Sequence, residues 1–341
     1  MPMTVRCGDT LLFQTLPVIA AGAAVGGQKR ERGPLAAEFD ELSADNRFGQ
    51  SSWEAAAKNT CSCAPRGCAC KRRRFRRKRC SWPLPGICRP SARHPAMPCG
   101  SWACPLPGCS GACSTMAEGL ALGAALCEGG AARNLLAMAS SHFCAAERQF
   151  RTPLSYGAVR TPTAQWTATA AGCCLLQPQG EGVGIAAATF GRVQDYQVKD
   201  INNMGAAMAP AAASTLLHYF KDTGTEPQEF DCIYTGDLGQ VGSQLLRELL
   251  AAEGLLIKNH VDCGCILFDA NEQSVKSGGS GPGCCAAVLC GHILPRLRRG
   301  SQKRVLFTAT GALMSQTTFL QKETIPAVAH LVELRAPEKE K

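Results

Sequence analysis

Hydrophobic and polar positions follow regular patterns over most of the chain after residue 110, and these patterns predict alternating strands and helices. Short, continuous apolar runs are typical of buried strands, whereas longer runs with a 3.6-residue period are typical of helices. Strands are predicted at 135–139, 167–176, 183–190, 230–235 and 305–310. Helices are predicted at 112–127, 206–221, 241–253 and 285–297. This alternation indicates an α/β protein.

Two of these helices have recognisable starts. Ser114 and Thr115 open the helix at 112–127, and Glu118 places a carboxylate in its first turns. Pro210 falls inside the pattern at 206–221, and we expect it near a helix start because the first turn tolerates proline.

An internal repeat relates two stretches of the chain. Gly111-Ala112-Cys113, a helix and the strand LLAMAS are matched by Gly283-Cys284-Cys285, a helix and the strand VLFTAT. The repeat predicts a duplicated α/β/α fold, layered αβαβα, with buried central helices, a first half at 1–185 and a second half at 186–341. The abundant Ala and Gly suit helices that are packed between two sheets.

Composition limits the class of protein. Hydrophobic residues make up 45% of the 341 residues and charged residues 18%, which excludes disorder throughout. The longest weakly polar runs, at 16–27 and 119–127, are shorter than the ~18 residues of a spanning helix. The N-terminal pattern does not suggest a signal peptide.

Residues 59–110 differ from the rest of the chain. They contain no Asp or Glu, 11 of the 36 Lys and Arg, and 9 of the 21 cysteines. The net charge of +9 therefore originates here, because the remainder has 25 basic and 27 acidic residues. The segment also holds the run KRRRFRRKR at 71–79 and the spacing C-x-C-x4-C-x-C at 61–70.

Three explanations fit this segment: a basic arm that binds nucleic acid, a zinc module, or a translation in the wrong reading frame. We favour the third. The heptapeptide Trp82-Pro83-Leu84-Pro85-Gly86-Ile87-Cys88 can be encoded so that a one-nucleotide shift gives Leu-Ala-Leu-Ala-Gly-Asp-Leu. That product would be a buried strand and turn, equivalent to Tyr234-Thr235-Gly236-Asp237-Leu238 in the second half. We therefore draw no function from residues 59–110 and expect no nucleic-acid partner.

Several motifs outside this segment resemble the stage V sporulation protein AD family, whose fold is thiolase-like. They are GACSTMAEGLAL at 111–122, ERQFR at 147–151, MGAAMAPAAA at 204–213, TGDL at 235–238, HVDCG at 260–264 and GGSGPGCC at 278–285. The chain departs from the family pattern at Phe143 and Val261, where the family usually has Asn.

The resemblance implies a function. The family belongs to a complex of the inner spore membrane that takes up dipicolinic acid during sporulation and releases it at germination. The resemblance implies a peripheral, non-enzymatic subunit that binds dipicolinic acid, free or as its calcium chelate. It implies other stage V sporulation membrane proteins as partners and leaves a homodimer open. No cofactor is expected.

Cys113 begins the first central helix, where the helix dipole favours a thiolate. The resemblance to thiolases makes this position an acyl-accepting nucleophile, with His142 and His260 as candidate partners. An acyltransferase that uses Cys113 is therefore the alternative function.

A site for a planar dianion needs arginines, backbone donors and an apolar slot. Arg148, Arg151 and Arg192 are candidates for the arginines, and they could instead form ion pairs with nearby acidic residues. The glycine-rich loop at 278–283 could present N–H groups to an anion. The full set of candidate ligand-binding residues is Cys113, His142, Arg148, Arg151, Arg192, His260, Asp262, Ser280 and Gly281. No cysteine spacing outside 59–110 suggests a metal site, and we expect reduced thiols.

Overall fold

The computed structural model describes residues 4–30, 33–51, 56, 64, 82–87, 109, 111–144, 146 and 160–338. Most of the strands join into one large sheet that is built from two similar sets of four. The first set runs in the order β5 (Trp82–Ile87), β6 (Leu135–Ser141), β8 (Ala170–Gln177) and β3 (Val18–Gly26). β5 and β6 are parallel, and the other neighbours are antiparallel.

The second set repeats this order and these directions. It runs β10 (Cys232–Gly236), β13 (Arg304–Ala312), β14 (Ala327–Arg335) and β9 (Val183–Thr189). β10 and β13 are parallel, and the other neighbours are antiparallel. β11 (His260–Asp262) adds a parallel strand beyond β10. The repeated topology confirms the duplicated α/β architecture.

The two sets meet where β3 pairs with β9 through Val18–Gly184 and Ile19–Val183. The predicted boundary between residues 185 and 186 falls inside β9. β1 (Val5–Cys7) and β2 (Thr10–Leu12) pair with each other, and β2 continues onto β9.

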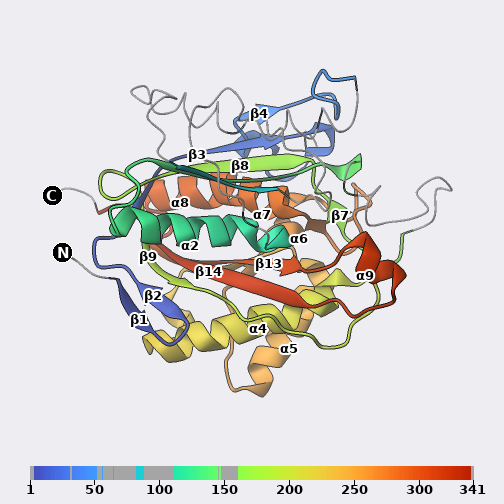
Figure 1. The fold of residues 1–341 in the computed structure, drawn as a ribbon. Coiled ribbons are helices and arrows are strands. Elements are labelled where there is room, and N and C mark those ends of the chain that lie inside the picture. The colour runs from blue at the N-terminus through green and yellow to red at the C-terminus, as the bar shows by residue number, and fades with distance from the viewer. Residues whose placement is uncertain are drawn as a thin grey trace.

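The central helices lie between the two sets of strands (Figure 1). The first is a short 3-10 turn, η5 (Ala112–Ser114), followed by α2 (Thr115–Glu128). The second runs through α7 (Pro282–Val288), a π-helical stretch (Leu289–Ile293) and α8 (Leu294–Arg299). A Cβ atom at Gly172 of β8 would lie 2.2 Å from the Ala286 carbonyl oxygen, so the close packing of helix on sheet requires glycine there.

An outer layer covers the second set of strands. It consists of α4 (Met204–Thr223) and α5 (Gly239–Ala252), which Figure 1 shows on the face of β13 and β14 away from α2. The side chain of Asn203 accepts a hydrogen bond from Ala206 N and caps α4. Pro210 lies inside this helix, so the expectation that it marks a helix start is wrong. Among the described residues, the layers are this outer pair of helices, the two sets of strands and the central helices between those sets.

Smaller elements connect this framework. They are η1 (Gln28–Arg30), η2 (Ala36–Glu38), β4 (Glu41–Leu42), β7 (Trp166–Thr167), η7 (Pro227–Glu229), α6 (Cys263–Leu267), β12 (Gly279–Ser280) and α9 (Gln316–Leu320).

β5 occupies the place in the first set that β10 occupies in the second. The reading-frame hypothesis puts a buried strand at this point, whereas the literal sequence has Pro83 and Pro85 there. Because proline lacks an N–H group, it is found mainly in edge strands. β5 ends the strand order of its set and pairs with β6. The position of β5 agrees with the internal repeat. The shift of reading frame in residues 59–110 stays a prediction.

Candidate functional site

Cys113 lies in the turn that leads into α2, pressed against the end of β13. A Cβ atom at Gly311 would lie 2.2 Å from the Gly111 carbonyl oxygen and 3.1 Å from the Cys113 nitrogen. Ala112 has a φ of 51°, a conformation that costs free energy for a non-glycine residue. The surrounding contacts therefore hold this turn in place.

Local hydrogen bonds explain why the sequence folds this way. Ser114 Oγ donates to the Gly111 carbonyl oxygen at 2.6 Å, and Thr115 Oγ1 donates to the Ala112 carbonyl oxygen at 2.6 Å. Gly111 N donates to a carboxylate oxygen of Glu118. Burial raises the pKa of Glu118. Ser114 and Glu118 lie at this helix start as predicted, but the Ser114 side chain makes no capping hydrogen bond to α2.

The start of the second central helix faces this turn, as the repeat predicts. Cys285 Sγ lies 3.6 Å from the Cys113 carbonyl oxygen. Burial raises the pKa of the Cys285 thiol far above its usual value, and the charge of Asp237 adds to the effect. The first turns of the two central helices therefore lie against each other. We call residues 111–115, 237, 262 and 282–285 the Cys113 junction.

Asp262 is buried and organises the loops on one side of this junction. Its carboxylate accepts hydrogen bonds from Thr235 Oγ1 at 2.8 Å and from three backbone N–H groups. These belong to Leu238, Gly239 and Gly264, at 3.1, 2.9 and 2.9 Å. Burial raises the pKa of Asp262 to about 6, although the hydrogen bonds act to lower it. This carboxylate has a structural role.

The environment of His260 differs from that of Cys113. Its Nε2 atom lies 2.8 Å from Thr235 Oγ1, and burial lowers its pKa to about 4. It lines a cavity of about 630 Å³ together with Tyr234 and His292, and Cys113 is not among the lining residues. The ring is therefore neutral at pH 7 and engaged with a threonine.

His142, Ser280 and Gly281 gather at the end of β6. His142 Nε2 lies 2.8 Å from the Asn46 carbonyl oxygen. Ser280 belongs to β12, which pairs with β7, and Gly281 O accepts a hydrogen bond from Cys284 N. Gly283 N donates to Ser141 Oγ, the residue before His142. The glycine-rich loop is thus tied to the end of β6.

The predicted arginines do not assemble with these residues in the described part of the chain. Arg192 is 61% exposed and forms an ion pair with Asp9 at 2.7 Å. This contact supports the ion-pairing alternative, with Asp9 as the acidic residue, rather than a role in an enclosed site. Arg148 and Arg151 lie outside the described residues.

A group of side chains that the sequence did not indicate lies beside the glycine-rich loop. The rings of Phe143 and Trp166 stack with centroids 4.1 Å apart and planes inclined by 10°. Arg160 lies over both rings, and Lys29 Nζ lies 3.6 Å from the Trp166 centroid. We call Lys29, Phe143, Arg160 and Trp166 the Trp166 cluster. Phe143 was noticed in the sequence only as a departure from the family pattern.

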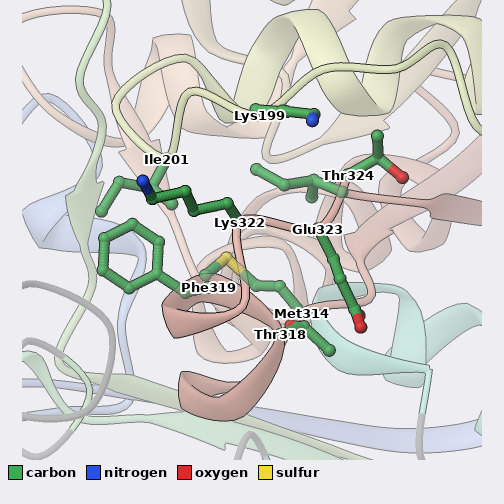
Figure 2. Close-up of a pocket in the computed structure, with 9 residues that line it drawn as sticks. Lys199, Ile201, Met314, Thr318, Phe319, Lys322, Glu323 and Thr324 are labelled. Atoms are coloured by element: carbon green, nitrogen blue, oxygen red, sulfur yellow. The ribbon is translucent and has the colours of Figure 1, made fainter.

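Figure 2 shows a smaller cavity of about 240 Å³ between α9 and the loop before α4. Met314, Phe319 and Ile201 give it an apolar lining. The ammonium groups of Lys199 and Lys322 lie at opposite sides of this cavity in the view, so they do not form a common anion cradle (Figure 2).

Metal-binding and membrane-spanning features were also sought in the described ranges. There, no group of three or more His, Cys, Asp or Glu side chains is arranged to hold a metal ion. The cysteines described there have free thiols. None of the helices in these ranges has the length and apolar character needed to cross a bilayer.

The sequence is similar to one family along nearly its whole length. The family model described as Stage V sporulation protein AD matches residues 7–335. Stage V sporulation protein AD of Bacillus subtilis strain 168 is 38% identical over 330 residues, which cover 94% of this chain and 95% of that protein.

Solved structures with low sequence identity share the fold. Cerulenin-bound OleA from Xanthomonas campestris has a TM-score of 0.64 at 14% identity, covering 97% of this chain and 99% of that one. The 3-oxoacyl-(acyl-carrier-protein) synthase III from Aquifex aeolicus has a TM-score of 0.57 at 12% identity, covering 94% and 99%. These similarities confirm the thiolase-like fold.

Proposed function

Because the chain belongs to the stage V sporulation protein AD family, we propose that it is a dipicolinic acid-binding subunit of the spore inner-membrane complex. In this role it acts in uptake of dipicolinate during sporulation and in its release at germination. The observation that carries the proposal is the family membership over residues 7–335.

Two of the candidate polar groups, His260 and Asp262, are engaged in other contacts. A nucleophilic thiol needs a base within hydrogen-bond reach and a third group that orients the base. His260 instead contacts Thr235, and Asp262 uses its carboxylate on Thr235 and backbone N–H groups.

The proposal includes the surroundings of the protein. It attaches peripherally to the forespore or spore inner membrane through other stage V sporulation membrane proteins. The ligand arrives as free dipicolinate or as its calcium chelate, and the proposal requires no cofactor, metal or nucleic acid. A homodimer is compatible with this role.

One observation favours the alternative, an acyltransferase that uses Cys113. The strained turn at Ala112 presents Cys113 at the start of a central helix, an arrangement that suits a nucleophile. His142 and His260 are the bases that such an enzyme would use.

Isothermal titration with dipicolinate and with acetyl-CoA distinguishes the two functions, combined with mass spectrometry of Cys113. Saturable dipicolinate binding without acylation of Cys113 is expected. A stable thioester on Cys113 would overturn the proposal in favour of the acyltransferase.

A further inference from the structure

The Trp166 cluster combines two cations with a stacked aromatic pair. Arg160 Cζ lies 4.5 Å from the Trp166 centroid and 5.3 Å from the Phe143 centroid. Lys29 Nζ lies 3.6 Å from the Trp166 centroid. All four residues are only partly buried, so part of each is exposed to solvent.

Four separate segments hold these side chains in a fixed arrangement. Lys29 lies in η1 directly after β3, and its carbonyl oxygen accepts a hydrogen bond from Gln273 Nε2 at 2.6 Å. Phe143 N donates to Thr169 Oγ1, and Arg160 Nη1 donates to the Gln165 carbonyl oxygen. These bonds fix the backbone at Lys29 and Phe143 and orient the side chain of Arg160, which lowers the entropic cost of binding a ligand.

Trp166 is also joined to the glycine-rich loop. Its backbone N–H donates to the Gly278 carbonyl oxygen at 2.8 Å, and β7 pairs in parallel with β12. Gln165, the residue before it, donates from Nε2 to the Asp237 carbonyl oxygen at 2.6 Å. The cluster thus lies beside candidates that the sequence indicated, Ser280 and Gly281, and contacts the edge of the Cys113 junction.

The charges of the cluster favour an anion. Burial lowers the pKa of Lys29, and the neighbouring charge of Arg160 lowers it further. A carboxylate placed between the two cations would relieve this repulsion. The guanidinium of Arg160 can bind a carboxylate through two N–H groups. Phe143 and Lys29 cover the two faces of the Trp166 ring, so an aromatic ligand would pack against the edges of the stacked pair.

We propose that the Trp166 cluster is a binding site for a planar aromatic carboxylate, held by Lys29 and Arg160 through its charge and by Phe143 and Trp166 through its ring. The identification of this anion as dipicolinate rests on the proposed function.

The test measures binding to the full chain, and in parallel to the chain with the reading frame of 59–110 restored. Three probes are titrated by calorimetry: dipicolinate, benzene-1,3-dicarboxylate and cis-cyclohexane-1,3-dicarboxylate. The third probe carries two carboxylates without an aromatic ring. Tryptophan fluorescence is recorded as well, and Trp166→Phe assigns the signal because the chain has four tryptophans.

Arg160→Gln and Lys29→Met are each expected to weaken binding of the aromatic dicarboxylates at least tenfold. Arg299→Gln and Lys221→Met remove the same charges at exposed helix ends and should leave affinity within twofold. Wild type should bind the cyclohexane probe at least tenfold more weakly than the benzene probe. Circular dichroism checks that each variant is folded.

The outcomes separate this inference from the proposed function. If dipicolinate binds and neither Arg160→Gln nor Lys29→Met weakens it, the inference is wrong and the proposed function stands. If benzene-1,3-dicarboxylate binds through the cluster and dipicolinate does not, the cluster is a site but the proposed function fails. If neither aromatic probe binds, both are wrong.

Discussion

The Cys113 junction and the Trp166 cluster are neighbouring regions with opposite chemistry. The junction is rich in thiols and mostly buried, although Cys113 itself is only partly buried, and the Asp262 carboxylate accepts hydrogen bonds from backbone N–H groups. The cluster is partly open and carries two cations over an aromatic pair. The difference indicates that the charged groups of the two regions differ in access: Asp262 is buried and hydrogen-bonded, whereas Lys29 and Arg160 are partly exposed. In this molecule the groups suited to hold a charged ring lie beside the thiol region, on other segments.

The largest expected effect concerns the junction. Asp262→Ala should lower the free energy of unfolding by at least about 3 kcal/mol, because it leaves three backbone N–H groups buried without an acceptor. Urea denaturation measures the change. Asp200→Ala removes an exposed carboxylate that accepts one bond from Asn202 N and serves as the control. An equal loss in both variants would contradict a structural role for Asp262.

A pH dependence of stability should follow from the same carboxyl group. Its pKa is about 6 in the folded protein, against a usual value of 3.8, so the folded state binds the proton more tightly. The protonated Asp262 carboxyl therefore adds roughly 3 kcal/mol to the free energy of unfolding below pH 4, and this stabilisation is lost as the pH rises to about 6. Unfolding of wild type and Asp262→Asn between pH 4 and 7 checks this. The variant should lack that part of the pH dependence, and an unchanged profile would argue against it.

One substitution in each region compares their parts in ligand binding. Arg160→Gln should weaken dipicolinate binding at least tenfold, whereas Cys113→Ser should change it by less than threefold, because the charge that attracts the anion lies in the cluster. Calorimetric titration of the two variants side by side gives the ratio. A greater loss of dipicolinate affinity for Cys113→Ser than for Arg160→Gln would indicate that the ligand binds in the Cys113 junction.

The smallest effect is expected at Phe143. Phe143→Asn introduces the residue that the family resemblance implies at this position and removes one ring of the stacked pair. The affinity for dipicolinate should fall about threefold, since such aromatic contacts contribute about 0.5–1.5 kcal/mol. Binding of the cyclohexane probe should stay the same. If both probes lose affinity equally, Phe143 acts through the conformation of its loop rather than through its ring.

Regular patterns made most of the elements predictable. The central helix after Cys113 and the strand at β6 follow from local periodicity, and the facing position of Cys285 follows from the repeat. The run at 16–27 was treated only as a stretch too short to span a membrane, yet it contains β3, which lies in the middle of the sheet. Apolar character alone does not distinguish a strand between two others from a buried helix.

The candidate site was predictable only in part. Asp262 and Ser280 were indicated by motifs. In the structure Asp262 accepts a hydrogen bond from Gly264 N, and Ser280 pairs with Thr167 just before the second central helix. Arg192 was chosen for its charge. Its ion pair with Asp9 could not be predicted from the sequence pattern, because the two residues lie far apart along the chain. The Trp166 cluster was missed because its members come from residues 29, 143, 160 and 166, and contacts between cations and rings have no sequence period.

The sequence by itself determined the duplicated α/β architecture, the family and the anomaly of residues 59–110, because periodicity, internal repeats and composition are properties of the linear chain. Only the tertiary structure decided which polar groups are occupied and which are accessible. Asp262 meets its N–H partners, and Lys29 meets Trp166, only when loops from different strands converge. Burial then sets the pKa of each group, and burial depends on the packed layers rather than on neighbours in the chain.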